Sequence, residues 1–93
     1  MALRTKTITG ANQYSDGVRL IGYFNLSLSG TWVATVTIQR SFDDGSTWFD
    51  VKEFTVNTQE YGFEPERMTD VQYRIGVKTG NFTSGEVVTR LSQ

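Results

Sequence analysis

The sequence predicts an all-β fold, a small antiparallel β-sandwich (Ig-like or jelly-roll-like) of about six or seven strands. Apolar and polar residues alternate with a period of two over several segments, as in strands that bury one face. Short turn signals that contain glycine separate these segments, which is typical of all-β domains. No stretch of ten or more residues keeps the i, i+3, i+4 apolar spacing of a helix.

Two long alternating segments dominate the first half of the chain. "LRTKTIT" at residues 3–9 is expected to form the opening strand. In residues 18–28 the even positions are mostly apolar. In residues 31–42 the same alternation predicts a series of side chains that point into the core, beginning at Trp32 and ending at Phe42. Ser29-Gly30 between these two segments predicts a tight turn, so we expect them to pair as a hairpin.

The second half predicts three more strands and one irregular link. Strands are expected in "TWFDVKEFTV", "DVQYRIGVKT" and "EVVTRLSQ". Residues 57–69 hold the only proline, Pro65, and are expected to form a crossing loop with at most one short strand. The predicted core consists of Leu20, Phe24, Leu26, Trp32, Ala34, Val36, Ile38, Val51, Phe54, Val71, Tyr73, Ile75, Val87 and Leu91.

Length and composition predict one domain, residues 1–93, whose N-terminal arm (residues 1–11) is either flexible or paired as an edge strand. Two Trp, four Tyr and six Phe supply large buried areas, so a core without disulfides is feasible. The chain has no Cys and no His. It therefore lacks the residues that most often serve as thiolate ligand, general base and proton shuttle. We expect no enzymatic activity, no cofactor and no bound metal.

Charge and hydropathy argue against two classes of partner. The formal net charge is −1 and no basic stripe is present, so we expect no binding to nucleic acid. No apolar run approaches the roughly 20 residues that span a bilayer, so we expect no membrane association. The N-terminus has no apolar segment typical of a signal peptide, which favours synthesis in a cytosol-like compartment.

The stretch "SFDDGSTW", residues 41–48, allows three interpretations. Asp43, Asp44 and Asp50 could offer oxygen ligands to calcium, but such sites collect about six to eight oxygens. A hydrolytic carboxylate pair needs two acids about 5–9.5 Å apart across a cleft, and neighbouring strand residues point to opposite faces. The third interpretation is a structural turn, because Asp-Gly between alternating segments is a strong hairpin signal.

The turn residues carry a family resemblance. Ser41, Asp43, Gly45, Thr47 and Trp48 match S-x-D-x-G-x-T-W, which resembles the Asp-box hairpin that is repeated in sialidase-type propellers and found singly in other β folds. The resemblance implies that Ser41 and Asp43 organise the turn, that Trp48 packs beneath it and that the motif lies away from any chemistry. Propellers need several boxes and a much longer chain, so no sialidase activity is implied.

Residues 30–93 are similar to a diffuse group of short tailed-phage proteins. The similarity rests on "GTWVATVTIQRSFDDGSTW" and on "YRIGVKTGNFTSGEVVTRL". It implies a small β-sandwich virion component, assembled in the host cytoplasm, such as a capsid decoration or cement protein that binds the major capsid protein or another virion protein. The alternative is a carbohydrate- or receptor-binding module of a tail or spike, in which Trp32, Trp48 and loop aromatics would stack on sugars.

Four aromatic residues are candidates for partner contacts, because their predicted core roles are weakest and aromatics are favoured interface anchors. They are Tyr14, Tyr61, Phe63 and Phe82. Each could instead cover an end of the sandwich. The oligomeric state is left open between monomer, dimer and trimer, although a symmetric assembly would hide edge strands.

Overall fold

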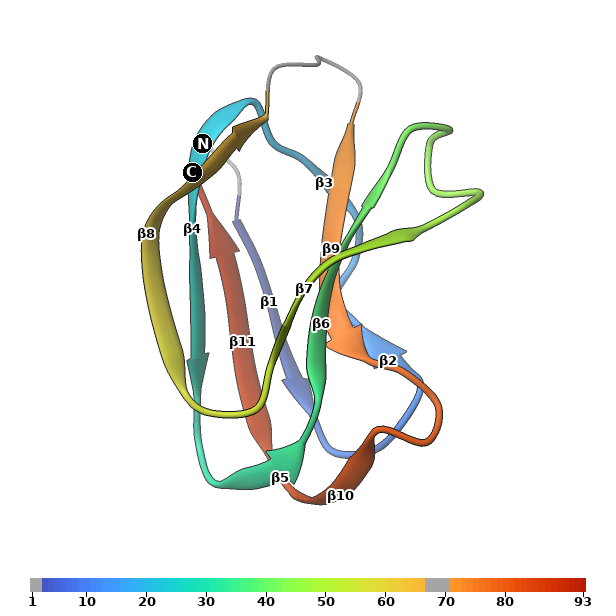
Figure 1. Ribbon diagram of the computed structural model, residues 1–93, viewed down its shortest axis with the longest axis vertical. Coiled ribbons are helices and arrows are strands. Elements are labelled where there is room, and N and C mark those ends of the chain that lie inside the picture. Colours follow the sequence, from blue (N-terminus) through green and yellow to red (C-terminus); the bar gives the residue numbers. More distant parts are fainter. Residues whose placement is uncertain (1–2, 67–70) are drawn as a thin grey trace.

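The computed structural model describes residues 3–66 and 71–93, with side chains for residues 3–59 and 71–93. The fold is all-β, as predicted, and every strand pairing is antiparallel. Figure 1 shows the strands arranged as a small sandwich. Eleven strands occur in the described ranges, more than the six or seven expected, because several contain only two or three residues.

The first sheet has the strand order β1-β11-β4-β8. Its members are β1 (Leu3–Ile8), β11 (Val87–Ser92), β4 (Gly22–Ser29) and β8 (Thr58–Glu66). The N-terminal arm thus forms an edge strand over residues 3–8, paired with β11. Residues 57–69 were expected to form an irregular link with at most one short strand. This expectation was wrong, because β8 has nine residues and pairs with β4 through two register shifts.

The second sheet has the order β2-β9-β6-β7, with β3 also paired to β9. Its members are β2 (Gln13–Tyr14), β3 (Val18–Arg19), β9 (Gln72–Val77), β6 (Val36–Ser41) and β7 (Phe49–Phe54). A separate two-stranded sheet joins β5 (Trp32–Ala34) to β10 (Phe82–Gly85) at one end of the sandwich.

The predicted hairpin of residues 18–28 with 31–42 does not form. β4 pairs with β11 and β8, whereas β6 pairs with β7 and β9. The link after Ser29 therefore carries the chain from one sheet into the other, by way of β5. Alternation specifies which face of a strand is buried, but it does not specify the neighbouring strand.

The core lies between the two larger sheets and contains most of the predicted residues. Phe24 of β4 packs on Tyr73 of β9, with ring centroids 4.9 Å apart, so this pair joins the two layers. Trp32 and Ala34 are only partly buried and pack against the core. Four buried hydrophobic residues were missing from the predicted core: Ile8, Val18, Leu28 and Val77.

Two predicted inward residues are exposed instead. Phe42 is 49% exposed and Val51 is 40% exposed. Phe42 follows the end of β6, where the β6–β7 hairpin (green in Figure 1) diverges from the neighbouring strands. Val51 lies on the edge strand β7, where the register with β6 shifts between Ile38 and Gln39.

Candidate functional site

The loop between β6 and β7, residues 42–48, is closed by hydrogen bonds from its own residues. The Ser41 hydroxyl donates to Asp43 Oδ1 at 2.8 Å and accepts the Gly45 backbone N–H at 2.9 Å. Asp43 Oδ1 also accepts the Thr47 backbone N–H at 2.8 Å. Ser41 is fully buried, so its hydroxyl anchors the loop from within. Satisfying several loop amides in this way restricts the loop to one conformation.

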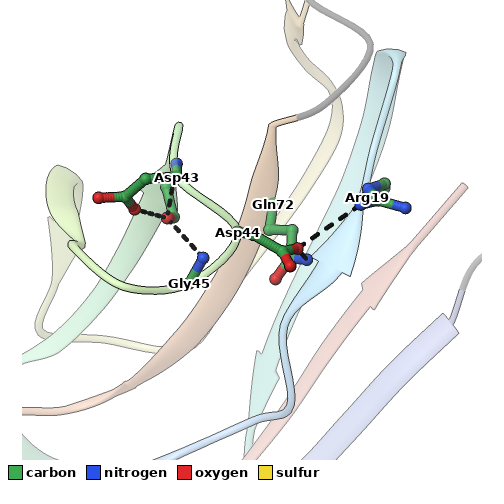
Figure 2. Close-up of polar contacts among 6 residues, drawn as sticks. Arg19, Asp43, Asp44, Gly45 and Gln72 are labelled. Carbon is green, nitrogen blue, oxygen red and sulfur yellow. Dashed lines mark hydrogen bonds and ion pairs between the residues drawn. The ribbon is translucent and has the colours of Figure 1, made fainter.

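The middle of the loop turns through the left-handed region. Asp44 has φ of 59° and Gly45 has φ of 88°, a conformation that glycine adopts without a steric penalty and that aspartate tolerates. This turn directs the Asp44 carboxylate away from Asp43 and toward the neighbouring strands (Figure 2). There it accepts a hydrogen bond from Gln72 Nε2 at 2.7 Å and lies 3.5 Å from the Arg19 guanidinium.

Trp48 packs beside this loop rather than projecting into solvent. It is half-buried, and the Arg74 guanidinium lies 4.4 Å from its ring centroid. The other aromatic partner of Arg74 is Tyr14, at 3.9 Å. Arg74 thus lies against the faces of two aromatic rings, and each ring face attracts the guanidinium cation. A face of Trp48 and a face of Tyr14 are therefore occupied within the protein.

Starting at Arg74, a series of hydrogen-bonded side chains crosses the outer face of the second sheet. Arg74 Nε donates to Gln39 Oε1 at 2.9 Å, and Gln39 Nε2 donates to Asp50 Oδ1 at 2.8 Å. Asp50 Oδ2 pairs with Lys78 Nζ at 2.6 Å. This series connects β9, β6 and β7, so the base of the hairpin is fixed by side chains as well as by the strand ladder.

The polar contacts shift several pKa values. The Thr47 backbone N–H, followed by the Ser41 hydroxyl, lowers the pKa of Asp43 from its ordinary value of 3.8. The hydrogen bond from Lys78, followed by that from Gln39, lowers the pKa of Asp50, and the same contact raises the pKa of Lys78. Burial lowers the pKa of Arg74, an effect that Tyr14 opposes. The two aspartates therefore favour their ionised forms in the folded state.

Acid should weaken the loop through Asp43. Because its pKa is lower in the folded state, its contribution to stability is present above the unfolded pKa of 3.8 and is lost as pH falls through the native value. We expect Asp43→Asn to be less stable than wild type at pH 7, with a difference that shrinks below about pH 4. Urea unfolding from pH 7 to pH 2 measures this difference. Asp16→Asn, at an exposed aspartate outside the loop, is the control, and a pH-independent difference would contradict the expectation.

The tip of the hairpin carries an exposed aromatic pair that the sequence analysis did not assign to a site. Phe42 and Phe49 are 49% and 52% exposed, and their ring centroids lie 5.7 Å apart. The Arg40 guanidinium lies 4.6 Å from the Phe42 ring centroid. We call Phe42 and Phe49 the tip pair. Alternation placed Phe42 in the core, so nothing in the pattern of residues distinguished it as a surface residue.

The four predicted contact residues lie in different surroundings. Tyr14 is half-buried under Arg74, and Phe82 of β10 is half-buried against the core. Tyr61 and Phe63 belong to β8, and their side chains lie outside the described residues. Tyr14 and Phe82 therefore have different neighbours, and their role in partner binding stays a prediction.

The acidic residues of the loop point to separate partners. Asp43 faces Ser41 and Thr47, Asp44 faces Gln72, and Asp50 faces Gln39 and Lys78. Among the side chains that the structure describes, those of residues 3–59 and 71–93, no group of three or more acidic residues lies close enough together to hold a metal ion. In the same ranges, no helix is long and apolar enough to cross a membrane.

Comparisons with protein-family models, with curated proteins and with solved structures found no significant match.

Proposed function

We propose that this chain is a non-enzymatic structural protein of a tailed-phage virion, most concretely a capsid decoration or cement protein that binds the lattice of the major capsid protein. The observation that carries the proposal is the tip pair. Two large aromatic side chains about half exposed on one hairpin are unusual for a surface that has no partner, because burying them removes much apolar area from water.

The hairpin suits a contact role because its base and its turn are fixed before binding. The Ser41 and Asp43 hydrogen bonds hold the loop, and Asp44 ties it to Gln72 of β9. A preorganised anchor loses less conformational entropy on binding than a flexible loop. Aromatic residues and arginine are enriched among the residues that dominate binding energy, and Arg40 lies against the tip pair.

The edge of the second sheet extends this surface. Among the described strands, β7 has a neighbour on one side only, so its other side presents backbone N–H and C=O groups. A strand of the capsid protein could add to this edge through main-chain hydrogen bonds. Stable contacts bury about 1,600 Å² in total, and repeating a modest contact across a shell stiffens it without tight individual binding.

The tip pair is testable on capsids of the phage that encodes the chain. We expect wild-type protein to co-sediment with capsids lacking it until the sites are saturated. Phe42→Ser/Phe49→Ser should weaken binding by at least about 30-fold, because truncating a dominant anchor costs about 2 kcal/mol or more. Ile21→Ser/Val88→Ser is the control, since these residues are similarly exposed, at 53% and 42%, but lie outside the hairpin.

Circular dichroism of both double variants should match wild type, so that loss of binding is not loss of fold. The proposal fails if wild-type protein does not bind the capsids. It also fails if capsids that lack the protein resist heat and osmotic shock as well as complete ones do.

A further inference from the structure

At the end of the molecule opposite the hairpin tip, two shallow grooves meet at Trp32. Figure 1 shows β5, β10 and the link from β7 to β8 gathered at this end. One groove, of about 390 Å³, lies along β5 toward Asn81 and Thr83, and the other, of about 290 Å³, lies toward Thr31 and Asn57. Trp32 and Thr55 line both grooves. Their volumes are close to those of small-ligand sites, about 300–1,000 Å³.

The orientation of the Trp32 indole is fixed by its polar edge. Nε1 donates to Asn57 Oδ1 at 2.6 Å, and Asn57 Nδ2 donates to the Gly30 carbonyl at 3.0 Å. The ring is half-buried and also packs against the core. Asn57 therefore holds the indole, which contributes to the lining of both grooves, and a bound ligand would not need to order it.

The chemistry of the lining is neutral and rich in hydroxyl groups. No charged side chain is among the described residues that line either groove, although charged residues make up 20% of the chain. Threonine hydroxyls and the side-chain amides of Asn57 and Asn81 are among the polar groups that line the two grooves. Within the described part of the chain, the side chains of Thr35, Thr55 and Asn81 make no hydrogen bond to another residue, so they are available to a ligand.

From these observations we infer that the Trp32 grooves bind an uncharged oligosaccharide, with sugar units on both sides of the indole. The C–H bonds on a flat sugar face carry partial positive charge and pack on the negative face of an aromatic ring. Hydroxyl and amide groups at the rim provide both donors and acceptors for sugar hydroxyls. An anionic ligand would find no cationic side chain among the lining residues described here.

This site is separate from the proposed capsid contact, because the β6–β7 hairpin, which carries the tip pair, and β5, which carries Trp32, lie toward opposite ends of the molecule (Figure 1). A copy bound to the capsid through the tip pair could present the Trp32 grooves to solvent. Glycan binding can be measured on the isolated protein, so its failure would not affect the capsid proposal, and failure of capsid binding would not affect the glycan site.

The test uses the full chain labelled with ¹⁵N, because its two tryptophans give two separate indole N–H resonances. The probes are maltohexaose, cellohexaose, mannohexaose and galactohexaose, with oligogalacturonate as the charged comparison. We expect at least one neutral hexasaccharide to shift the Trp32 indole signal in a saturable way below about 10 mM, the weak range expected of an open site. The Trp48 signal should stay unchanged.

Variants identify the residues responsible without removing the indole. Thr55→Val/Asn81→Ala should weaken binding about 5- to 10-fold or more, since each change removes a neutral hydrogen bond. Thr5→Val/Asn12→Ala, at exposed positions away from the grooves, should leave binding unchanged. The inference is overturned if no neutral probe shifts the Trp32 signal, if oligogalacturonate binds more tightly than every neutral probe, or if Thr55→Val/Asn81→Ala binds as wild type does.

Discussion

Phe24→Ala is expected to lower the free energy of unfolding by about 3–5 kcal/mol, the cost of deleting a fully buried aromatic side chain. Phe24 is 1% exposed and packs on Tyr73 across the two sheets, so its removal leaves a cavity between the layers. A domain of this length has a total stability of about 5–14 kcal/mol. The variant should therefore be marginally folded or unfolded at 37 °C.

Urea unfolding followed by far-ultraviolet circular dichroism measures this loss. Tyr23→Ala is the matched control, because the adjacent side chain on the same strand is 66% exposed. Surface substitutions of this kind usually change stability by less than about 0.5 kcal/mol. Equal stability of the two variants would mean that the layers do not meet at Phe24.

Gly76→Ala is expected to destabilise the protein by about 3 kcal/mol, the upper end of the usual cost of overpacking. A Cβ atom at Gly76 would lie 2.2 Å from the Gln13 carbonyl oxygen and 2.4 Å from Tyr14 Cδ1. Both groups belong to β2, which pairs with β9 at this point. The added methyl group must push β2 outward, and the Tyr14 ring that holds Arg74 would move with it.

Differential scanning calorimetry should show a lower midpoint for Gly76→Ala, and the Trp48 fluorescence should change because Arg74 shifts relative to the indole. Gly10→Ala is the control, since a Cβ there meets its nearest neighbour, Gln13 Nε2, at an ordinary 3.5 Å. A Gly76→Ala protein with the midpoint of Gly10→Ala would show that β2 does not pack on β9 as described.

The sequence predicted burial better than it predicted pairing. In β4 the alternation correctly placed Phe24 and Leu26 inside, because a strand with one buried face repeats every two residues. The same alternation assigned the wrong neighbour to β4, since partner choice depends on contacts between distant residues such as those that join β4 to β11. Nothing in Ser29-Gly30 distinguishes a hairpin turn from a link between sheets.

The candidate site was only partly predictable for a related reason. The Ser41 and Asp43 contacts are local in sequence, so the motif alone identified the residues that close the loop. Phe42 looked like a core residue because its position continues the inward series of β6. Its exposure arises where the β6–β7 hairpin diverges from the neighbouring strands (Figure 1), an arrangement that local sequence does not record. The Trp32 grooves likewise arise from three separate segments that only the fold brings together.

An electron-microscopy reconstruction of the virion would show whether this sandwich binds the capsid through its β6–β7 hairpin, as we propose. We expect one sandwich-shaped density at each equivalent site on the outer shell, with residues 42–49 against the capsid protein and the Trp32 end facing solvent. Density for the chain only in the tail, or a shell-bound sandwich whose hairpin tip points into solvent, would rule out this mode of binding.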